Sequence, residues 1–361
     1  MTTPLLHPIP ALHDNYIWAL HDGSHAWVVD PGQAEAVLAW LAAQRLQLAG
    51  ILLTHHHGDH TGGVAALCAA TAAPAWGPAG EPLPDGVARV RGGARVALLG
   101  APFEAIEVPG HTAGHIAWYC AGFAPASIAS PAKGAPYSTS ASTLAGTPAP
   151  ASPPNPASAA DPAAARGQPL GPEGLLFCGD TLFSIGCGRL FEGSPAQMLA
   201  SLDRLAALPS STLVCCTHEY TLANLRFARA LEPTHAGLAI YQHWCQQQRN
   251  AGRPTLPSRI GRERALNPFL RSREPALRQA LLGFAPKFAL AETGAAASVT
   301  LASHASGGDN GSRRPTAATK GMAPNTASAD KAAQTPTESD AHWATDVSSF
   351  SALRRCKDSY A

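Results

Sequence analysis

The sequence predicts an α+β protein in which a strand-rich region comes first and a helical region follows. Short apolar runs bounded by turn residues recur up to residue 218, as is typical of buried strands. Beyond residue 220, apolar residues recur at helical spacing. Two segments, 122–173 and 291–340, are rich in small and polar residues and nearly free of large apolar ones. We expect both to be disordered insertions, because they cannot bury enough surface to offset their ordering entropy.

Seven segments have the pattern of strands. They are 15–20, 26–30, 50–53, 103–108, 116–120, 175–178 and 212–216, with further short strands within 87–108. Segment 103–108 alternates apolar and polar residues, as a half-buried strand does. Segments 15–20 and 26–30 flank a short turn, which predicts a hairpin at the edge of a sandwich.

Helices are expected where apolar residues recur every three or four positions. Val37, Leu38, Leu41 and Leu48 have this spacing, and the Ala-rich segment 64–73 follows the strand at 50–53. Another helix begins at Pro195, with Met198, Leu199, Leu202 and Leu205 facing inward. The helical patterns of the second half are 222–231, 236–250, 262–269, 275–282 and the basic tail 350–358. The 361 residues suffice for two domains with a sizeable core.

Charge and cysteine content narrow the class of protein. The formal net charge of +1 does not indicate a nucleic-acid or anionic-membrane partner. No apolar run approaches the roughly 20 residues that span a bilayer, and residues 1–10 lack the features of a signal peptide. None of the eight cysteines forms a C-x-x-C pair, so we expect reduced packing residues. The chain is expected to act as a cytoplasmic monomer.

The most informative stretch is residues 53–63, Leu-Thr-His-His-His-Gly-Asp-His-Thr-Gly-Gly, between a predicted strand and a predicted helix. His55 and His57 are two residues apart, so they point the same way on extended chain while His56 points elsewhere. Asp59 and His60 lie past a glycine where the chain can bend. The turn can therefore offer two pairs of ligands to two metal ions. Imidazole and carboxylate suit zinc, iron or manganese rather than calcium. A His-rich surface loop is the plainer alternative, which the flanking strand and helix disfavour.

Three later strands each lead into a residue of the same chemistry. His111 follows segment 103–108, Asp180 ends the buried run 175–179, and His218 follows segment 212–216. An unpaired carboxylate is costly at the end of a buried strand, and a pair of metal ions that Asp180 bridges removes that cost. We expect the three strand ends to lie on one rim of the sandwich, together with the histidine-rich turn.

The pattern Thr-His-x-His-x-Asp-His at 54–60 resembles the signature of the metallo-β-lactamase-like hydrolases, and the string 54–63 resembles glyoxalase II, the hydroxyacylglutathione hydrolases. The resemblance covers residues 10–120, 174–287 and 346–358. It implies an αββα sandwich in a catalytic domain, 1–218, followed by a helical substrate-binding domain, 219–361. Asp14-Asn15-Tyr16 and Asp30-Pro31-Gly32 also resemble this family, although turn chemistry alone would explain them.

The resemblance also implies a site and a reaction. One divalent ion would be held by His55, His57 and His111, the other by Asp59, His60 and His218, with Asp180 bridging them. Zinc is the first candidate for both ions, and iron or manganese would also fit. A metal-bridging hydroxide would attack the thioester of S-D-lactoylglutathione, giving D-lactate and glutathione in the second step of methylglyoxal detoxification. Asp59 would orient this nucleophile and handle its proton, and His115 would orient its neighbours through hydrogen bonds.

The substrate-binding residues that the resemblance implies come from three segments. Arg354 and Lys357 are one helical turn apart and would bind the carboxylates of glutathione, although a solvated helix end is the plainer interpretation. Arg189 and Tyr220 occupy positions that contact the glutathione moiety. Phe191 replaces a tyrosine that some members carry, so one hydroxyl contact is missing.

Three other functions fit parts of the pattern. A mononuclear-iron persulfide dioxygenase on the same fold would need only two histidines and an aspartate. A lactamase or nuclease is disfavoured by the helical C-terminal region and the neutral charge. A catalytically silent scaffold should lack ligands, and all seven are present.

Overall fold

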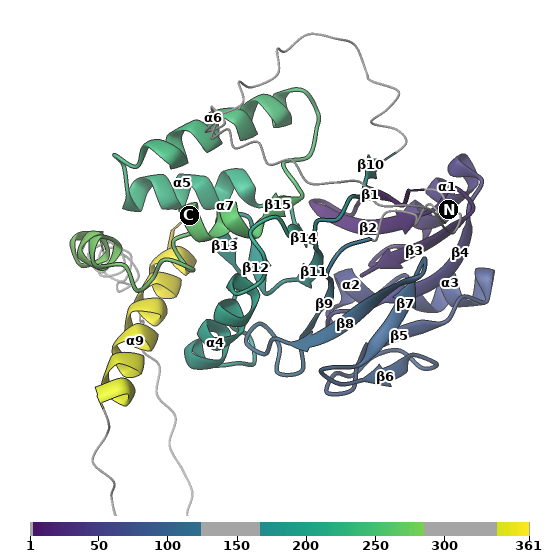
Figure 1. Cartoon of the computed structure of the whole chain (residues 1–361), viewed down its shortest axis with the longest axis horizontal. Helices are drawn as coiled ribbons and strands as arrows, with labels where there is room; N and C mark the ends of the chain where they lie inside the picture. The colour runs from purple at the N-terminus through teal and green to yellow at the C-terminus, as the bar shows by residue number, and fades with distance from the viewer. Residues whose placement is uncertain (1–2, 124–166, 285–337, 361) are drawn as a thin grey trace, which may run out of the picture.

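The computed structural model describes residues 3–123, 167–284 and 338–360, and it shows two mixed sheets with helices on either side (Figure 1). The first sheet has the order β10 (Gln168–Pro169), β1 (Leu5–Ala11), β2 (Asn15–His21), β3 (His25–Val29), β4 (Gln47–Leu52), β5 (Ala75–Pro78) and β6 (Ala88–Val90). The second has the order β15 (Ser258–Arg259), β14 (Leu213–Cys216), β11 (Leu175–Gly179), β9 (Ile116–Cys120), β8 (Ala101–Glu107) and β7 (Arg95–Leu98). A separate hairpin pairs β12 (Leu182–Phe183) with β13 (Gly186–Cys187).

The helices lie at opposite ends of the view in Figure 1. Those near the first sheet are α1 (Ala34–Gln44), α2 (Gly58–Thr61) and α3 (Val64–Thr71). The others are α4 (Pro195–Ala206), α5 (Thr221–Leu231), α6 (Ala236–Asn250), α7 (Ile260–Leu266) and α9 (Glu338–Asp358), and residues 275–284 are also helical. The predicted α+β class is confirmed.

Two hydrophobic clusters explain the layering. Trp18 of β2 packs in one cluster with Trp118 of β9 and Phe177 of β11, which joins the facing sides of the two sheets. Its neighbour Ile17 belongs to the other cluster, in which α1 and α3 cover the outer side of the first sheet. Successive side chains of a strand point to opposite faces, so β2 serves both clusters. The inward residues predicted for α4 join the first cluster, which completes an αββα arrangement.

The strand β1 was not predicted, and its prolines explain why. Pro8 and Pro10 lack the N–H that a central strand donates to its neighbours. The adjacent β10 pairs only with Leu5 and Leu6, so both prolines lie on the open edge of the sheet. The edge position makes their missing N–H groups harmless.

Three predicted boundaries are wrong. Leu48 lies in β4 rather than on a helix, because α1 ends at Gln44 and Arg45 adopts a left-handed backbone with φ 56°. The expected insertion 122–173 is too long at its C-terminal end, where β10 pairs with β1 and Leu170 is buried. The second expected insertion overlaps α9, which begins at Glu338. The remainder of both insertions lies outside the described residues.

The C-terminal region is tied to the sandwich by more than helix packing. β15 pairs with β14 and so extends the second sheet. Glu263 of α7 is fully buried and accepts hydrogen bonds from Ile185 N (2.7 Å) and from Asn267 Nδ2 (3.0 Å). Ile185 has a φ of 58° in the turn between β12 and β13, a strained conformation for a β-branched residue. Residues after 218 thereby hold the hairpin that carries one wall of the site.

Candidate metal centre and substrate pocket

The four segments that were expected to meet do meet at one rim. β8, β11 and β14 all run in the same direction, because β9 is antiparallel to both β8 and β11 while β14 is parallel to β11. His111, Asp180 and His218 therefore follow strand ends at the same edge of the second sheet. The turn after β4 of the first sheet brings the histidine-rich motif to the same place. Three groups of potential ligand atoms form there: His55, His57 and His111; His55, His60 and Asp180; Asp59, His60 and His218.

The first group consists of imidazole nitrogens alone. His57 Nδ1 lies 3.0 Å from His55 Nε2 and 3.1 Å from His111 Nε2. His57 thus presents a different ring nitrogen from its two neighbours. Because ring nitrogens with facing lone pairs repel one another, such a convergence is stable when a cation lies among them.

The group of Asp59, His60 and His218 adds a carboxylate oxygen. Asp59 Oδ2 lies 3.4 Å from His218 Nε2 and 3.5 Å from His60 Nε2. Asp180 faces both groups: its Oδ1 lies 3.4 Å from His60 Nε2, and its Oδ2 lies 3.5 Å from His111 Nε2 and 3.3 Å from His218 Nε2. One buried carboxylate is thus within reach of ions in either group.

The unpaired atoms of the site fit a cation. Among the described residues, His60 Nε2 and Asp180 Oδ1 are buried and have no hydrogen-bond partner. Buried polar atoms without partners are rare and costly. Nitrogen and oxygen donors together are the ligands that divalent transition metals take in proteins. The donor set therefore fits divalent metal binding.

The imidazoles and carboxylates of the site shift the pKa values of one another. Burial lowers the pKa of His218, but hydrogen bonds to Asp180 and Asp59 outweigh this effect and raise the pKa to about 11. Burial would raise the pKa of Asp59, yet the hydrogen bond from His218 and the charge of His60 hold it below the ordinary value. Asp59 is therefore an ionised hydrogen-bond acceptor at neutral pH.

In three of the histidines, the ring nitrogen Nδ1, which is not part of the ligand groups, lies close to an oxygen atom. His218 Nδ1 lies 2.8 Å from Asp14 Oδ1, His111 Nδ1 lies 2.8 Å from the carbonyl of Arg189, and His60 Nδ1 lies 3.1 Å from Asp30 Oδ2. Such partners fix the tautomer and ring orientation of metal-ligating histidines.

Asp14 and Asp30 lie in the segments 14–16 and 30–32, which resemble the family but which turn chemistry alone would also explain, and no site role was predicted for either residue. The signal for Asp30 was present, because it ends a buried apolar strand just as Asp180 does. His115 has the orienting role expected of it. It accepts a hydrogen bond from Asp180 N at 3.3 Å and stacks on His55 with ring centroids 4.6 Å apart.

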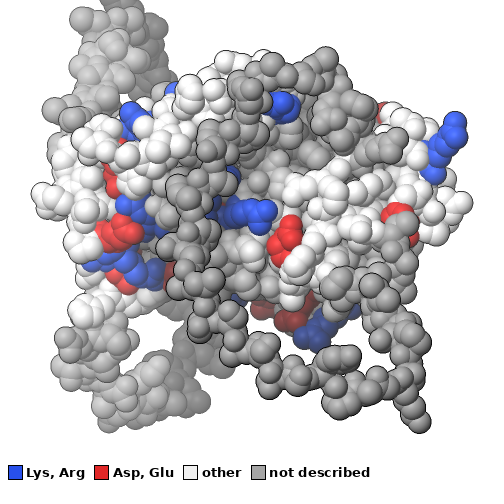
Figure 2. All heavy atoms as spheres, turned by 45° about the horizontal axis from the view of Figure 1, so that its top comes forward, with Lys and Arg blue, Asp and Glu red and all other residues white. Residues whose placement is uncertain are grey.

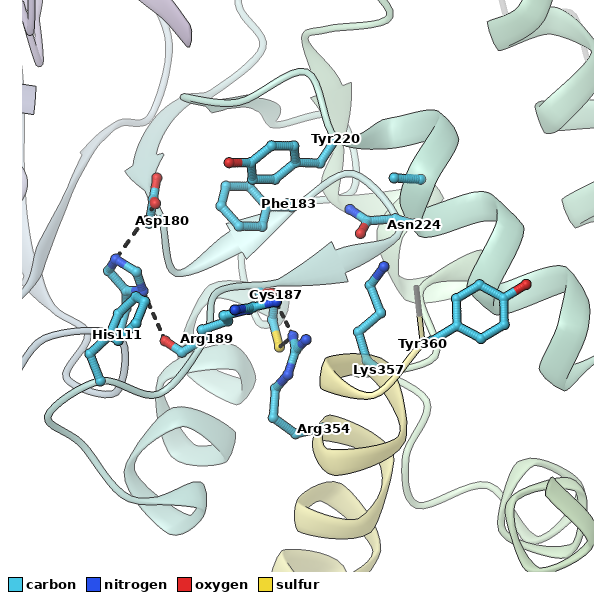
Figure 3. A pocket seen from close by; sticks show the side chains of 12 residues that line it. His111, Asp180, Phe183, Cys187, Arg189, Tyr220, Asn224, Arg354, Lys357 and Tyr360 are labelled. Atoms are coloured by element: carbon cyan, nitrogen blue, oxygen red, sulfur yellow. Dashed lines mark hydrogen bonds and ion pairs between the residues drawn. The ribbon is translucent and has the colours of Figure 1, made fainter. Parts of the chain in front are cut away.

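A cavity of about 410 Å³ leads from this site to α9 (Figure 3). His111 and Asp180 lie at one end, and Arg354 and Lys357 lie at the other. All five residues predicted to bind substrate line it: Arg189, Phe191, Tyr220, Arg354 and Lys357. Phe183, Cys187, Asn224 and Tyr360 also line it and were not predicted. The sequence pattern can predict the helix or strand on which each of these four residues lies. It does not predict whether the side chain points into the cavity.

The basic end of the cavity is not an ordinary solvated helix end. Arg354 is only 5% exposed, and it donates to the carbonyl of Cys187 at 2.9 Å and to Asp358 Oδ1 at 2.8 Å. Burial and the charge of Arg354 lower the pKa of Lys357 to about 8. An anionic ligand would stabilise the protonated form of this lysine, because an opposite charge nearby favours the charged form.

Aromatic side chains line the end near the metal groups. Tyr220 stacks on His218, with ring centroids 4.7 Å apart and ring planes 3° from parallel. Phe191 is 64% exposed and its ring meets those of His57 and His111 edge to face. An exposed phenyl ring at the mouth of a polar site gives a ligand an apolar contact.

Three further observations concern the described residues. On the face drawn in Figure 2, basic atoms lie beside acidic atoms, and much of the other described surface is neither. Among the described residues, no helix combines the length and the apolar character that crossing a membrane requires. All eight cysteines lie in the described segments and are free thiols.

Comparison with known proteins agrees with this geometry. The profile of the metallo-β-lactamase superfamily matches residues 13–122, and the fold and the His/Asp site place the chain in that class. The profile described as the hydroxyacylglutathione hydrolase C-terminus matches residues 219–293.

Curated relatives narrow the class to a family. A hydroxyacylglutathione hydrolase of Albidiferax ferrireducens is 50% identical over 277 residues, which covers 77% of this chain and 90% of the relative. One of Cupriavidus taiwanensis is 48% identical and covers 76% of this chain and 89% of the relative. One of Pseudomonas aeruginosa is 46% identical, with 75% and 87% covered. The chain belongs to the hydroxyacylglutathione hydrolase family and is a hydrolase.

Proposed function

We propose that the protein hydrolyses S-D-lactoylglutathione, or a similar S-2-hydroxyacylglutathione, to the 2-hydroxy acid and glutathione. One observation carries this proposal: a single cavity joins the His/Asp centre to the cations of Arg354 and Lys357. A substrate with a reactive carbonyl at one end and carboxylates at the other matches both ends at once. The names of the relatives support the same substrate.

The ligand assignment is part of this proposal. His55, His57 and His111 would hold one divalent ion, Asp59, His60 and His218 would hold the other, and Asp180 would touch both. Zinc is the first candidate, with iron and manganese as alternatives that accept the same donors. Bound ions would supply Lewis-acid chemistry, lowering the pKa of water and polarising the thioester carbonyl.

Asp59 would receive the proton of the attacking water. Its Oδ2 is held by Asn15 Nδ2 at 3.1 Å and faces His218 Nε2. The carboxylate is ionised at neutral pH, so it can accept a hydrogen bond from the attacking water and would aim it at the carbonyl.

The opposite end of the cavity would position glutathione. Lys357 and Arg354 would bind its carboxylates through charge-assisted hydrogen bonds, and Arg189 would add a third cation. Tyr220 would offer its hydroxyl, whereas Phe191 can offer only apolar contact.

The organisation of the chain follows from the same proposal. Residues 1–218 would form the catalytic domain and residues 219–361 the substrate-binding domain, with β15 and Glu263 fastening the second to the first. We propose a cytoplasmic monomer that has no nucleic-acid partner.

The substrate proposal is tested by following the loss of thioester absorbance with S-D-lactoylglutathione. The rival reaction is measured beside it, as oxygen uptake with glutathione persulfide on the same metal-analysed preparation. Rapid hydrolysis without oxygen uptake is expected. Oxygen uptake without hydrolysis would replace the proposal with a persulfide dioxygenase.

Substrate affinity should fall as pH rises through the pKa of Lys357. This lysine is protonated below about pH 8 and neutral above it, so its bond to a substrate carboxylate is present at pH 7 and lost by pH 9.5. Loss of one charge-assisted hydrogen bond should raise KM about tenfold. Steady-state kinetics across this range measure the effect.

The control for this pH effect is Lys357→Arg, because an arginine stays protonated throughout the range. Its KM should be nearly constant between pH 7 and 9.5. An equal rise of KM in the wild type and in Lys357→Arg would show that another group causes the pH dependence.

A further inference from the structure

His56 is the one histidine of the 55–57 run that belongs to neither proposed ion, and its ring lies between two carboxylates. Its Nδ1 is hydrogen-bonded to Glu81 Oε2, and its Nε2 lies 3.4 Å from Glu192 Oε1. Both glutamates also bind the loop after β8. Glu192 Oε2 accepts a hydrogen bond from Ala113 N at 2.8 Å, and Glu81 Oε1 accepts one from Gly114 N at 2.8 Å. The ring and the two carboxylates therefore connect two loops that are distant in sequence.

Glu81 makes the stronger connection, with one oxygen for each loop. Its Oε2 accepts from the backbone N of His56 at 3.2 Å and from the ring of the same residue. Its Oε1 accepts from Thr112 Oγ1 at 2.7 Å and from Gly114 N at 2.8 Å. The carboxylate is buried, so these bonds are shielded from competing water.

The backbone around Glu81 is itself held in place. The guanidinium of Arg89 donates to the carbonyl oxygens of Glu81 and Leu83. Gly80 packs directly on Gly114, where an added Cβ would come within 2.7 Å of the Gly80 carbonyl group. Glu81 thus projects from a braced segment rather than from a mobile loop.

A third metal ion is the alternative for this cluster, because the three side chains offer ligand atoms within 4.8 Å of one another. The hydrogen bonds argue against it. Both oxygens of Glu81 already accept two donors each. This differs from the proposed centre, where Asp180 Oδ1 and His60 Nε2 are buried without a hydrogen-bond partner among the described residues.

The connected loops are the ones that carry the first group of ligands. His55 and His57 flank His56, and His111 precedes Thr112. We propose that Glu81, together with His56 and Thr112, is a positioning device that sets the separation of these two loops for one ion. The inference rests on the proposed metal centre. Glu81 touches no ligand side chain, so it would act through the loops alone.

The test is the substitution Glu81→Gln with metal affinity as the readout. Glutamine keeps the size of the side chain, but its amide group would face N–H or O–H donors on one of the two loops. Substituting a residue that supports a metal ligand typically lowers the affinity for the metal by about 10- to 100-fold. We expect one of two bound ions to weaken by at least about tenfold, while the other keeps its affinity. Chelator competition measures both, and the absorption spectrum of the cobalt-substituted protein identifies the altered site.

Kinetics give a second readout, since kcat should fall while KM stays unchanged, because the basic end of the cavity is untouched. Glu104→Gln is the matched control, because the side chain of Glu104 pairs with the exposed Arg95 and forms a hydrogen bond or ion pair with no other described residue. Thr112→Val removes one donor to Glu81 without changing shape and should weaken the same ion to a smaller degree, and Thr112→Ser should restore it. This pair keeps the test decisive if Glu81→Gln folds poorly.

Three results would overturn the inference. They are unchanged affinity in Glu81→Gln, equal weakening of both ions, and a third ion in the wild type that Glu81→Gln loses. Failure of the wild type to bind any divalent ion would contradict the proposed function itself. The two failures are therefore distinguishable.

Discussion

Replacing Asp180 by asparagine is expected to lower kcat/KM by at least about 1,000-fold and to weaken the binding of both metal ions. The carboxylate lies within 3.5 Å of His60 Nε2, His111 Nε2 and His218 Nε2. An amide keeps one oxygen but loses the negative charge that would be shared by two cations. Metal analysis of the purified variant and thioester hydrolysis at saturating metal measure the two effects.

Asp203→Asn is the matched control for Asp180→Asn. Asp203 lies on α4 and pairs with Arg273 on the surface, at 2.7 Å, so its loss should leave metal content and activity near wild type. If Asp180→Asn retained two tightly bound ions and wild-type turnover, the bridging role would be refuted.

Asp59→Asn should lower kcat by about 100-fold or more, even with metal in excess. The carboxylate is ionised and is held toward the centre by Asn15. Asparagine can occupy the same space but is a far weaker acceptor for the proton of an attacking water. Pre-steady-state and steady-state hydrolysis measure this loss separately from substrate binding, which should change little.

Asp85→Asn provides the control for Asp59→Asn, because Asp85 is exposed in the turn that precedes β6. Recovery of full kcat in Asp59→Asn at high metal concentration would show that Asp59 is only a ligand. In that case another group would have to orient the nucleophile.

The convergence of ligands at one rim could be predicted because each one follows a strand. His111, Asp180 and His218 each stand within three residues of the end of a predicted strand, and the strand-turn-helix context of residues 53–63 is local. Strands that run in the same direction end at the same edge of a sheet. Local sequence patterns were therefore enough to predict that these residues meet. The common direction of β8, β11 and β14 in the second sheet confirms this prediction.

The contacts behind the ligands depend on tertiary packing and could not be predicted in this way. Asp14 meets His218 across 204 positions, and Glu81 meets Thr112 across 31. Asp14 lies in a segment that resembles the family, but no local pattern around Asp14 or Glu81 predicts which side chain its carboxylate contacts. Composition misjudged residues 167–173 for a similar reason, since a single buried Leu170 anchors a stretch that otherwise looks like linker.

The most direct test of the dinuclear centre is a metal titration of the chelator-treated protein that follows bound zinc and hydrolysis of S-D-lactoylglutathione together. Binding should reach two equivalents per chain, and activity should be negligible without metal and maximal at two equivalents. Full activity at one equivalent, or hydrolysis that is independent of metal, would contradict the proposed two-ion mechanism.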